Sequence, residues 1–415
     1  MSLRAVETLD DAFELKRWLG EQRGVVALDT ETSGVNVYAP DFRVRLLQLG
    51  TANEAWVVPF ERWIGLADEI LTAYVNDGKT ITMHNSRFDK LALQMCGVDV
   101  PWHAIDDTMI AIRLAEPHKL AGLKPSAMRH ISAAAGDSQK ALSDAMRKNG
   151  WTWATVPLDF PWYRYYAAMD TILTARLREV PAVLEGFNSP VYGLEMDVRA
   201  ICSRMEQRGM RINREFCVEK GAELRFEADT LAEEINATHG FHPTSTADFA
   251  RWLIRSGAPP GKTTPAGAPS TDKEALADIV GDVTCPAVVR DVVAKVLRLR
   301  QCMKMASSYF DNFIKMADSN DVLHPSIETV AARTGRMSVR DPALQTLPRV
   351  SSDPDSKLVR SAVRARTDDE LLVACDYEQI ELRQTGSFSG DDGLCDAFAD
   401  ADAGGDDFFL SLIHI

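Results

Sequence analysis

The chain has 415 residues and a mass of 45.9 kDa, of which 46% are hydrophobic and 26% are charged. This composition indicates globular structure in about two to four domains and excludes a disordered chain. The 60 acidic and 46 basic side chains give a net charge of −14, so a nucleic acid would have to bind to a local basic surface.

The cysteines and the apolar segments exclude several further classes of protein. The seven cysteines are scattered without a C-x-x-C pair, which excludes a zinc site visible in the sequence and indicates free thiols in a reducing compartment. Apolar runs stay far below the roughly 20 residues of a membrane span. Residues Met1–Asp11 lack the basic-then-apolar order of a secretory signal.

Strand-like and helix-like segments alternate over residues 1–189, which predicts a mixed α/β domain. The predicted strands are Val25–Leu28, Val44–Leu49, Ala55–Val58 and Ile81–His84, and the predicted helices are Phe88–Cys96, Thr108–Leu114 and Tyr163–Val180.

The pattern changes near residue 190. Residues 190–320 are predicted to be helical, interrupted at Gly257–Pro269, where prolines and glycines predict a surface loop. A third region, 321–415, contains a predicted strand at Leu371–Cys375 and a predicted helix from Gln379. The acidic stretch Asp391–Asp407 and the apolar run Phe408–Ile415 follow without a clean closing signal, so we expect an interrupted domain.

Acidic side chains recur in the first region where strands end and helices begin. Asp29 and Glu31 lie two apart at the end of a predicted strand and therefore point to the same side. Asp89 lies near the start of a predicted helix, and Tyr166 and Asp170 share a face of another. Four such carboxylates are suited to hold two Mg²⁺ or Mn²⁺ ions for phosphodiester hydrolysis, with Tyr166 orienting the attacking water.

Each acidic motif alone has an ordinary structural explanation. A single D-x-E on a strand is usually a solvated edge or a local salt bridge, and an Asp near a helix start is often a cap. The three motifs in this order are much harder to obtain by chance, so we predict a metal site.

The three motifs resemble those of the DEDDy 3′–5′ exonucleases. They read D-T-E-T at residues 29–32, N-x-x-F-D at 85–89 and Y-x-x-x-D at 166–170. The resemblance implies an RNase H-like sheet, proofreading of single-stranded 3′ ends and two divalent cations. Thr32, Asn85 and Phe88 match positions assigned to contact with DNA.

Residues 333–366 carry eight basic and three acidic side chains, a local +5 in an acidic chain. Clustered arginines clamp phosphates, although a run of charge is more often a solvated face. The next segment, Leu371–Cys375, delivers Asp376 to its end. Such an Asp holds the metals in nucleotidyl transfer, whereas the structural alternative is a buried strand with an acidic turn.

This region resembles family A DNA polymerases of the DNA polymerase I type. The segments are T-G-R-M-S at residues 334–338, P-A-L-Q-T-L-P at 342–348 and D-Y-E-Q-I-E at 376–381. The resemblance implies that Asp376 is a catalytic metal ligand and that Gln379 and Glu381 contact the nucleotide. It assigns DNA contacts to Arg333, Arg336, Gln345 and Arg360.

Several departures from the family pattern affect the expected activity. Ala343 and Thr346 replace two asparagines, and Glu378 replaces a serine. The 32 residues after Arg383 contain no Lys, so we expect the fingers and the second palm acid motif to be missing and the palm to be truncated.

The expected fold is α/β: an RNase H-like 3′–5′ exonuclease domain, a helical thumb and an incomplete α+β polymerase palm, over 1–189, 190–320 and 321–415. The expected function is that of a family A DNA polymerase in DNA replication, from a phage or a bacterium, located in the cytoplasm or the host cytoplasm. We expect the chain to degrade 3′ ends and to bind primer–template DNA weakly.

Further partners follow from the same resemblance. Mg²⁺ in the polymerase site and dNTPs are expected if the missing parts are supplied, for example by a complementary C-terminal polymerase chain. Two alternatives remain: a free-standing exonuclease, which would not extend primers with dNTPs, and a non-catalytic DNA-binding protein, in which Asp29→Ala would change nothing.

Overall fold

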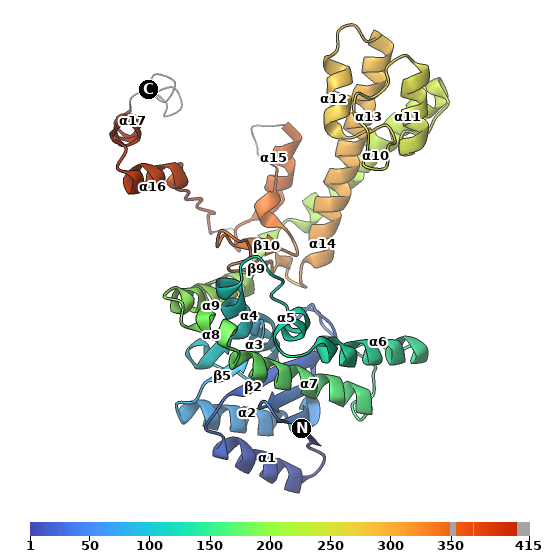
Figure 1. Ribbon diagram of the computed structural model, residues 1–415. Coiled ribbons are helices and arrows are strands. Elements are labelled where there is room, and N and C mark those ends of the chain that lie inside the picture. Colours follow the sequence, from blue (N-terminus) through green and yellow to red (C-terminus); the bar gives the residue numbers. More distant parts are fainter. Residues whose placement is uncertain (349–353, 368, 405–415) are drawn as a thin grey trace. The chain divides into compact units, whose positions relative to one another are not determined.

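The computed structural model describes residues 1–348, 354–367 and 369–404, without the side chains of residues 354–356. The chain divides into two compact units, Met1–Arg364 and Ala365–Ile415 (Figure 1). None of the described helices combines the length and the apolarity of a membrane span.

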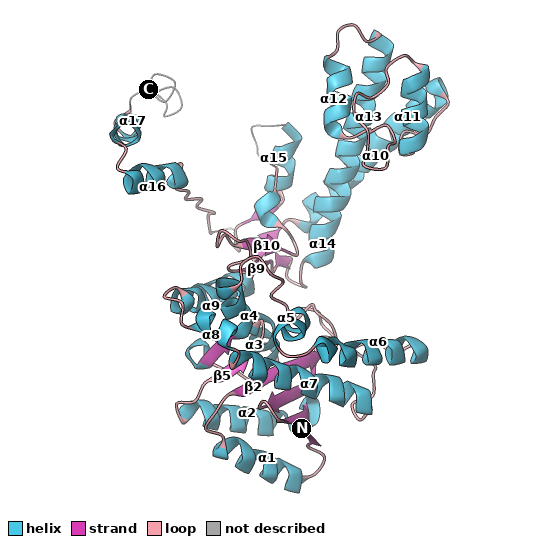
Figure 2. Ribbon diagram, viewed as in Figure 1, coloured by secondary structure: helices cyan, strands magenta, loops and turns pink. Residues whose placement is uncertain are grey.

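The first part of unit 1 is built around a six-stranded sheet (Figure 2). The strands are β1 Ser2–Ala5, β2 Val26–Thr32, β3 Val44–Gly50, β4 Glu54–Pro59, β5 Ile81–Met83 and β6 Ile105–Asp107. The helices are α1 Leu9–Glu21, α2 Phe60–Asn76, α3 Ser86–Met95, α4 Thr108–Ala115, α5 Leu123–His130, α6 Asp137–Asn149, α7 Pro161–Arg178 and α8 Pro181–Phe187.

The strands follow the order β1-β4-β3-β2-β5-β6, with β2, β3 and β4 antiparallel to their neighbours in the central meander. Alternate residues of this meander face opposite layers. Leu47 and Leu49 pack in the cluster with α1 and α2, whereas Leu46 packs in the cluster with α6 and α7. The sheet is therefore covered on both faces, which explains why its strands are apolar almost throughout.

All four predicted strands and all three predicted helices of this region are present, with ends shifted by a few residues. The structure adds β1 and β6, which are short edge strands, and several helices, including α1 and α2. Together they confirm the predicted RNase H-like α/β class.

The middle of the chain is helical as predicted, apart from one short strand, β7 Met210–Ile212. The helices are α9 Tyr192–Arg208, α10 Arg214–His239, α11 Thr246–Arg255, α12 Lys273–Gly281, α13 Ala287–Met305 and α14 Asn312–Met316, with a π-helical turn, Ala306–Asp311, between the last two. The predicted loop at Gly257–Pro269 joins α11 to α12.

These helices pack in two separate hydrophobic clusters. The stem cluster joins α10 and α13 to β7 and includes Leu224 and Leu299. The tip cluster joins the far end of α10 to α11, α12 and α13 and includes Phe249 and Trp252. Val292, Val296 and Leu299 lie at helical spacing on α13 and are all buried, whereas Met303, one turn further, is 41% exposed.

Three strands that are far apart in the sequence form a small sheet at the base of the stem. Strand β7 pairs with β8 Val322–Leu323 on one side and with β11 Val363–Arg364 on the other. A two-stranded sheet pairs β9 Ser326–Glu328 with β10 Ser338–Arg340, and helix α15 spans Pro354–Ser361. The predicted boundaries at 189/190 and 320/321 stay predictions.

Unit 2 contains two described helices, α16 Ile380–Ser389 and α17 Asp392–Asp402. Helix α16 matches the predicted helix from Gln379, and α17 lies in the acidic stretch. The predicted strand Leu371–Cys375 is wrong: among the described residues, this segment pairs with no strand, and Leu371 and Val373 are 89% and 83% exposed. Apolar, β-branched composition favours a strand, but a strand forms only where a partner accepts its hydrogen bonds.

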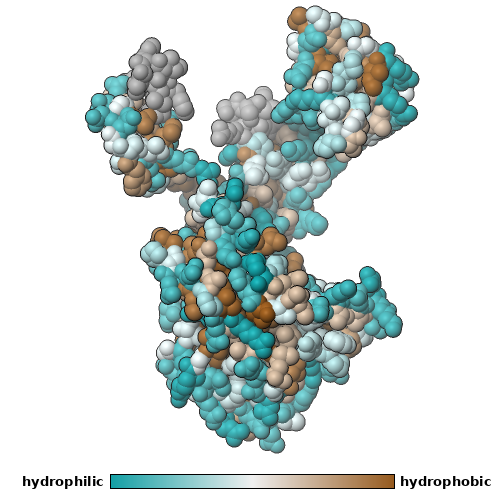
Figure 3. Space-filling model, viewed as in Figure 1, coloured by the Kyte–Doolittle hydropathy of each residue, from teal (hydrophilic) through white to brown (hydrophobic). Residues whose placement is uncertain are grey.

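The apolar run Phe408–Ile415, where we expect an interrupted domain, lies outside the described residues. Elsewhere, hydrophobic side chains reach the surface in several small groups among polar ones (Figure 3). One group follows the outer face of α9 and includes Leu194 and Met205, which are 59% and 56% exposed. The inner face of α9 is polar instead, because it buries Arg199 and Glu206.

Candidate functional site

Strand β2 presents two acidic side chains to one face of the sheet. Its residues Val26 and Leu28 pack in the cluster with α1 and α2, so Asp29 and Glu31 point to the opposite face, where α7 lies. The pairing with β3 shifts between Glu31 and Thr32, so the regular ladder ends where these acids lie.

Helix α7 brings the remaining acid to the same face. Pro161 occupies the first turn, where its missing N–H is harmless. Small buried residues, Ala167 and Ala168, let the helix pack closely on the sheet, and Tyr166 and Asp170 lie one turn apart beside them. The Tyr166 and Asp170 side chains therefore lie on the same side of α7.

Three of the predicted ligands converge. One carboxylate oxygen from each of Asp29, Glu31 and Asp170 lies within 4.8 Å of the others. Glu31 and Asp170 are buried, and Asp29 is half-buried. Among the residues that the structure describes, no other three acidic, His or Cys side chains approach in this way.

Asp89 approaches from the neighbouring helix α3. Strand β5 is short, and it pairs with β2 at Val26 and Ala27, before β2 reaches Thr30. Further along, the Thr30 N–H donates to Asp89 Oδ1 at 2.9 Å, and the Thr30 hydroxyl donates to the same oxygen at 2.7 Å. Asp89 is 4% exposed and close enough to Asp29 and Glu31 to raise their pKa values.

Burial raises the pKa values of all four carboxyl groups. At Asp29 and Glu31, burial and the neighbouring carboxylates together raise the pKa well above its ordinary range. Burial raises the pKa of Asp89 to about 7, against the two hydrogen bonds from Thr30. The pKa of Asp170 is also raised by burial, and Lys124 opposes the rise. A cluster of hard oxygen ligands that repel one another fits divalent cations, which would relieve the repulsion.

Lys124 is part of this site, although no motif pointed to it. It lies on α5, its ammonium group forms an ion pair with Asp170 Oδ1, and it lies 4.9 Å from the centre of the Tyr166 ring. Its side chain is 12% exposed. The lysine therefore balances part of the negative charge from the side of α5.

Asp107 was also missed, and it positions the start of α3. Its carboxylate accepts hydrogen bonds from the N–H groups of Asn85, Ser86, Met109 and Ile110, and it is 1% exposed. It thus ties the beginning of α3 to the beginning of α4. The Asp-Asp-Thr sequence at residues 106–108 was a possible capping signal.

The predicted DNA contacts of the exonuclease region lie around the carboxylates. The Thr32 hydroxyl donates to the Gly34 carbonyl at 2.8 Å. Asn85 precedes α3 in the left-handed conformation, with φ 65°. Phe88 is half-buried against the main core. Their roles in DNA contact stay predictions.

The predicted contacts of the basic region lie in two places in unit 1. The Gln345 amide oxygen accepts from the Val339 N–H at 3.1 Å, and Arg360 Nε donates to the Pro348 carbonyl at 2.8 Å. Arg333 Nη1 lies 3.5 Å from His118 Nδ1. Arg336 is exposed. Of the other basic residues in this stretch, Arg349 lies outside the described residues.

The three predicted polymerase residues lie in unit 2. Asp376 is exposed in the unpaired segment before α16. Gln379 precedes that helix in the left-handed conformation, with φ 49°, and Glu381 lies in its first turn. Among the described residues, Asp376 belongs to no group of three acidic, His or Cys side chains that could hold a metal ion.

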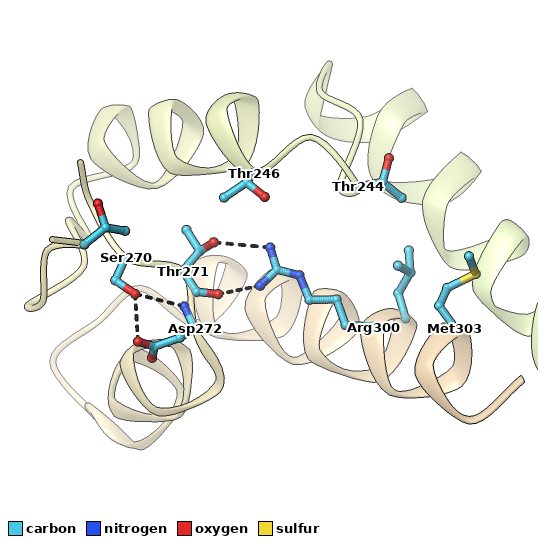
Figure 4. Close-up of a pocket in the computed structure, with 9 residues that line it drawn as sticks. Thr244, Thr246, Ser270, Thr271, Asp272, Arg300 and Met303 are labelled. Atoms are coloured by element: carbon cyan, nitrogen blue, oxygen red, sulfur yellow. Dashed lines mark hydrogen bonds between the residues drawn. The ribbon is translucent and has the colours of Figure 1, made fainter. Parts of the chain in front are cut away.

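A polar cavity of about 480 Å³ lies at the tip of the helical region, away from the carboxylates in sequence (Figure 4). The Arg300 guanidinium donates to the backbone carbonyl and, at 3.3 Å, to the hydroxyl of Thr271. Asp272 caps α12 and accepts from Ser270. These polar groups satisfy one another, so the cavity does not extend the candidate site.

Comparison with protein families divides the chain in two. Residues 5–180 match the family model described as 3′–5′ exonuclease, and residues 214–412 match DNA polymerase family A.

Individual proteins give the same result. The chain is 28% identical to the DNA polymerase of Mycobacterium phage D29 over 96% of this chain and 67% of the phage protein, and 28% identical to DNA polymerase I of Treponema pallidum over 77% and 31%. The solved POL domain of Pol1 from M. smegmatis, in complex with DNA primer–template and dNTP, matches with a TM-score of 0.70 and 19% identity over 97% of this chain and 65% of that one. The chain thus spans about two thirds of the phage protein and of this domain, and less than a third of the Treponema protein.

Proposed function

We propose that this chain, a family A DNA polymerase with a 3′–5′ exonuclease domain, removes nucleotides from the 3′ ends of DNA. Four carboxylates, those of Asp29, Glu31, Asp89 and Asp170, would hold the two divalent cations, Mg²⁺ or Mn²⁺, that this reaction uses. The observation that carries this proposal is the convergence of three carboxylate oxygens within 4.8 Å in a buried site. Bound divalent cations would lower the pKa of a water and stabilise the leaving 3′ oxygen.

The side chains around the carboxylates have their own tasks in this proposal. Burial and the neighbouring acids raise the pKa of Tyr166, so its hydroxyl stays protonated and can orient a water beside Asp170. Lys124 places a positive charge against Asp170 Oδ1, beside the Tyr166 ring. Thr30 holds Asp89 in place through two hydrogen bonds. Thr32, Asn85 and Phe88 would contact the terminal nucleotides.

The test is degradation of a 5′-labelled single-stranded oligonucleotide with Mg²⁺ and, separately, with EDTA. Asp29→Ala should lower the rate by about 100-fold or more while DNA binding is kept, because the substitution removes a ligand. Asp144→Ala, at an exposed Asp on α6, is the matched control and should keep the wild-type rate. Unchanged degradation by Asp29→Ala would contradict the proposal and favour a non-catalytic DNA-binding protein.

We further propose that residues 333–348 and Arg360 contact primer–template DNA. The local charge of +5 over residues 333–366 supports this, and so do the hydrogen bonds that join Gln345 to Val339 and Arg360 to Pro348. For these 415 residues alone we propose hydrolysis without synthesis, since among the described residues Asp376 belongs to no group of three acidic, His or Cys side chains that could hold a metal ion. Primer extension with dNTPs would contradict this second proposal and leave the first intact.

A further inference from the structure

Aromatic side chains gather between α6 and α7, next to the candidate metal site. The first of the two tryptophans in the Trp-Thr-Trp sequence, Trp151, packs against Phe160 at 5.1 Å and belongs to the core. The second, Trp153, is 37% exposed. Its ring centre lies 6.0 Å from that of Tyr166 and 6.3 Å from that of Tyr163. An exposed indole thus lies next to Tyr166, one turn of α7 before Asp170.

The loop that carries Trp153 is fixed from the neighbouring strand. Arg45 Nη1 donates to the Trp153 carbonyl at 2.8 Å, and Arg43 Nη2 donates to the Ala154 carbonyl at 3.1 Å. Arg45 is 8% exposed and lies in β3, the strand that pairs with β2 where Glu31 lies. A turn closed by Thr152 and Thr155 stiffens the loop further.

An indole held in this way is suited to stack on a nucleobase. Every base offers a π face, so stacking does not depend on sequence, as a nuclease that digests any 3′ end requires. Large aromatic rings supply much contact area at a low cost in conformational entropy. The arginine anchors lower that cost again, because the loop is ordered before the DNA arrives.

Resting on the proposed exonuclease function, we propose that Trp153 is a stacking platform for a base near the 3′ end of single-stranded DNA entering the carboxylate site. Trp153 is therefore a substrate-positioning residue rather than a metal ligand. Because the contact is made equally in the ground state and in the transition state, it contributes to KM and leaves kcat nearly unchanged.

The kinetic test compares Trp153→Ala and Trp153→Phe with Trp162→Ala. Trp162 is a matched control, because it is 49% exposed in the first turn of α7 and its ring lies against Tyr165 instead of Tyr166. On a short single-stranded oligonucleotide, Trp153→Ala should raise KM by at least about fivefold and change kcat by less than about twofold. Trp153→Phe should keep most of the wild-type KM, and Trp162→Ala should match the wild type.

A substrate series separates stacking from a purely structural role. Each oligonucleotide has one abasic site at one of the last few positions before the 3′ end. The KM difference between the wild type and Trp153→Ala should vanish for the position whose base contacts Trp153, since the variant then loses nothing further. An equal penalty on every abasic substrate, or no penalty on the intact one, would overturn the proposal.

Tryptophan fluorescence tests base stacking on Trp153 separately from hydrolysis of DNA. With Ca²⁺ in place of Mg²⁺, the same oligonucleotide should quench tryptophan emission in the wild type and in Trp162→Ala, and much less in Trp153→Phe. If the wild type failed to hydrolyse DNA in Mg²⁺, the exonuclease proposal would fall, while loss of quenching in Trp153→Phe would still support stacking. Equal quenching in all three proteins would overturn it.

Discussion

Lys124 and the proposed divalent cations would compete for one oxygen of Asp170. The ammonium group lies against Asp170 Oδ1, so a cation that binds there displaces it. We expect Lys124→Met to bind Ca²⁺ or Mg²⁺ about 10-fold more tightly than the wild type, because a charged hydrogen bond no longer has to be broken. Titration calorimetry without DNA measures this affinity directly.

Lys148→Met is the matched control for the charge change. Lys148 is exposed near the end of α6 and should leave the metal affinity as it is. An unchanged or weaker affinity in Lys124→Met would show that the lysine instead holds Asp170 in its ligating position.

His84 makes the fold sensitive to acid. Burial lowers the pKa of His84 from 6.5 to about 4, while Nδ1 lies 2.8 Å from the Thr108 hydroxyl. Between these two pH values the unfolded chain binds a proton that the folded protein excludes, so the stability contributed above pH 6.5 is lost as the pH falls toward 4. We expect His84→Gln to flatten this part of the pH dependence of the free energy of unfolding.

Urea denaturation at several pH values between 4 and 7.5 provides the measurement. Burial raises the pKa of Asp89 to about 7, which acts in the same pH range with the opposite sign, so the difference between His84→Gln and the wild type is the quantity to compare. His103→Gln, at an exposed position, is the control. Parallel pH profiles for His84→Gln and the wild type would contradict the prediction.

At the scale of elements, helix α9 buries the charged side chains of Arg199 and Glu206 and leaves apolar side chains such as Leu194 exposed. Glu206 is 1% exposed. Its carboxylate accepts a hydrogen bond from Arg199 Nη2 at 3.0 Å and lies 3.5 Å from Arg87 Nη1 of α3. Its carboxylate also accepts from the Ile327 N–H, and its backbone carbonyl lies 2.8 Å from His324 Nδ1. One carboxylate therefore joins the exonuclease motif around Asp89 to α9 and β9.

Removing that carboxylate should be costly. We expect Glu206→Ala to lower the free energy of unfolding by about 3–5 kcal/mol, because it leaves two arginines without their buried partner. Chemical denaturation measures the change. Replacing both Glu206 and Arg199 by Met should recover part of the loss.

Asp144→Ala provides the control, since it breaks the exposed Arg147–Asp144 pair and should cost less than about 1 kcal/mol. A similar small cost for Glu206→Ala would mean that water replaces the carboxylate without penalty.

Much of this arrangement could be predicted from the sequence, because local rules govern it. Asp29 and Glu31 share a strand face, and Tyr166 and Asp170 share a helix face, so their relative directions follow from backbone periodicity. Family comparison then confirmed the exonuclease and polymerase regions.

What the sequence did not show depends on contacts between distant segments. Lys124 lies 46 residues from Asp170, and nothing in its own neighbourhood marks it. Glu206 lies on a helix that leaves apolar side chains such as Leu194 and Met205 exposed on its other face. The segment Leu371–Cys375 has the composition of a strand, but pairing requires a neighbour that composition cannot supply.

At the scale of the whole molecule, unit 1 has its own cores and contains the whole carboxylate cluster. We expect residues 1–364 alone to fold and to keep the metal-dependent exonuclease rate within about twofold. Size-exclusion chromatography and the oligonucleotide assay provide the measurements. A soluble but inactive protein would show that unit 2 contributes to hydrolysis.

The small sheet at the base of the stem has an evolutionary consequence. Residues 213–321 depart from β7 and return at β8, and these two strands are antiparallel neighbours. In topology, residues 213–321 are therefore the loop of one β-hairpin. The tip cluster at the far end of this loop is separate from the stem cluster next to β7. We therefore expect insertions and deletions at the far end to be tolerated better than changes in β7 or β8, because they leave this strand pairing intact.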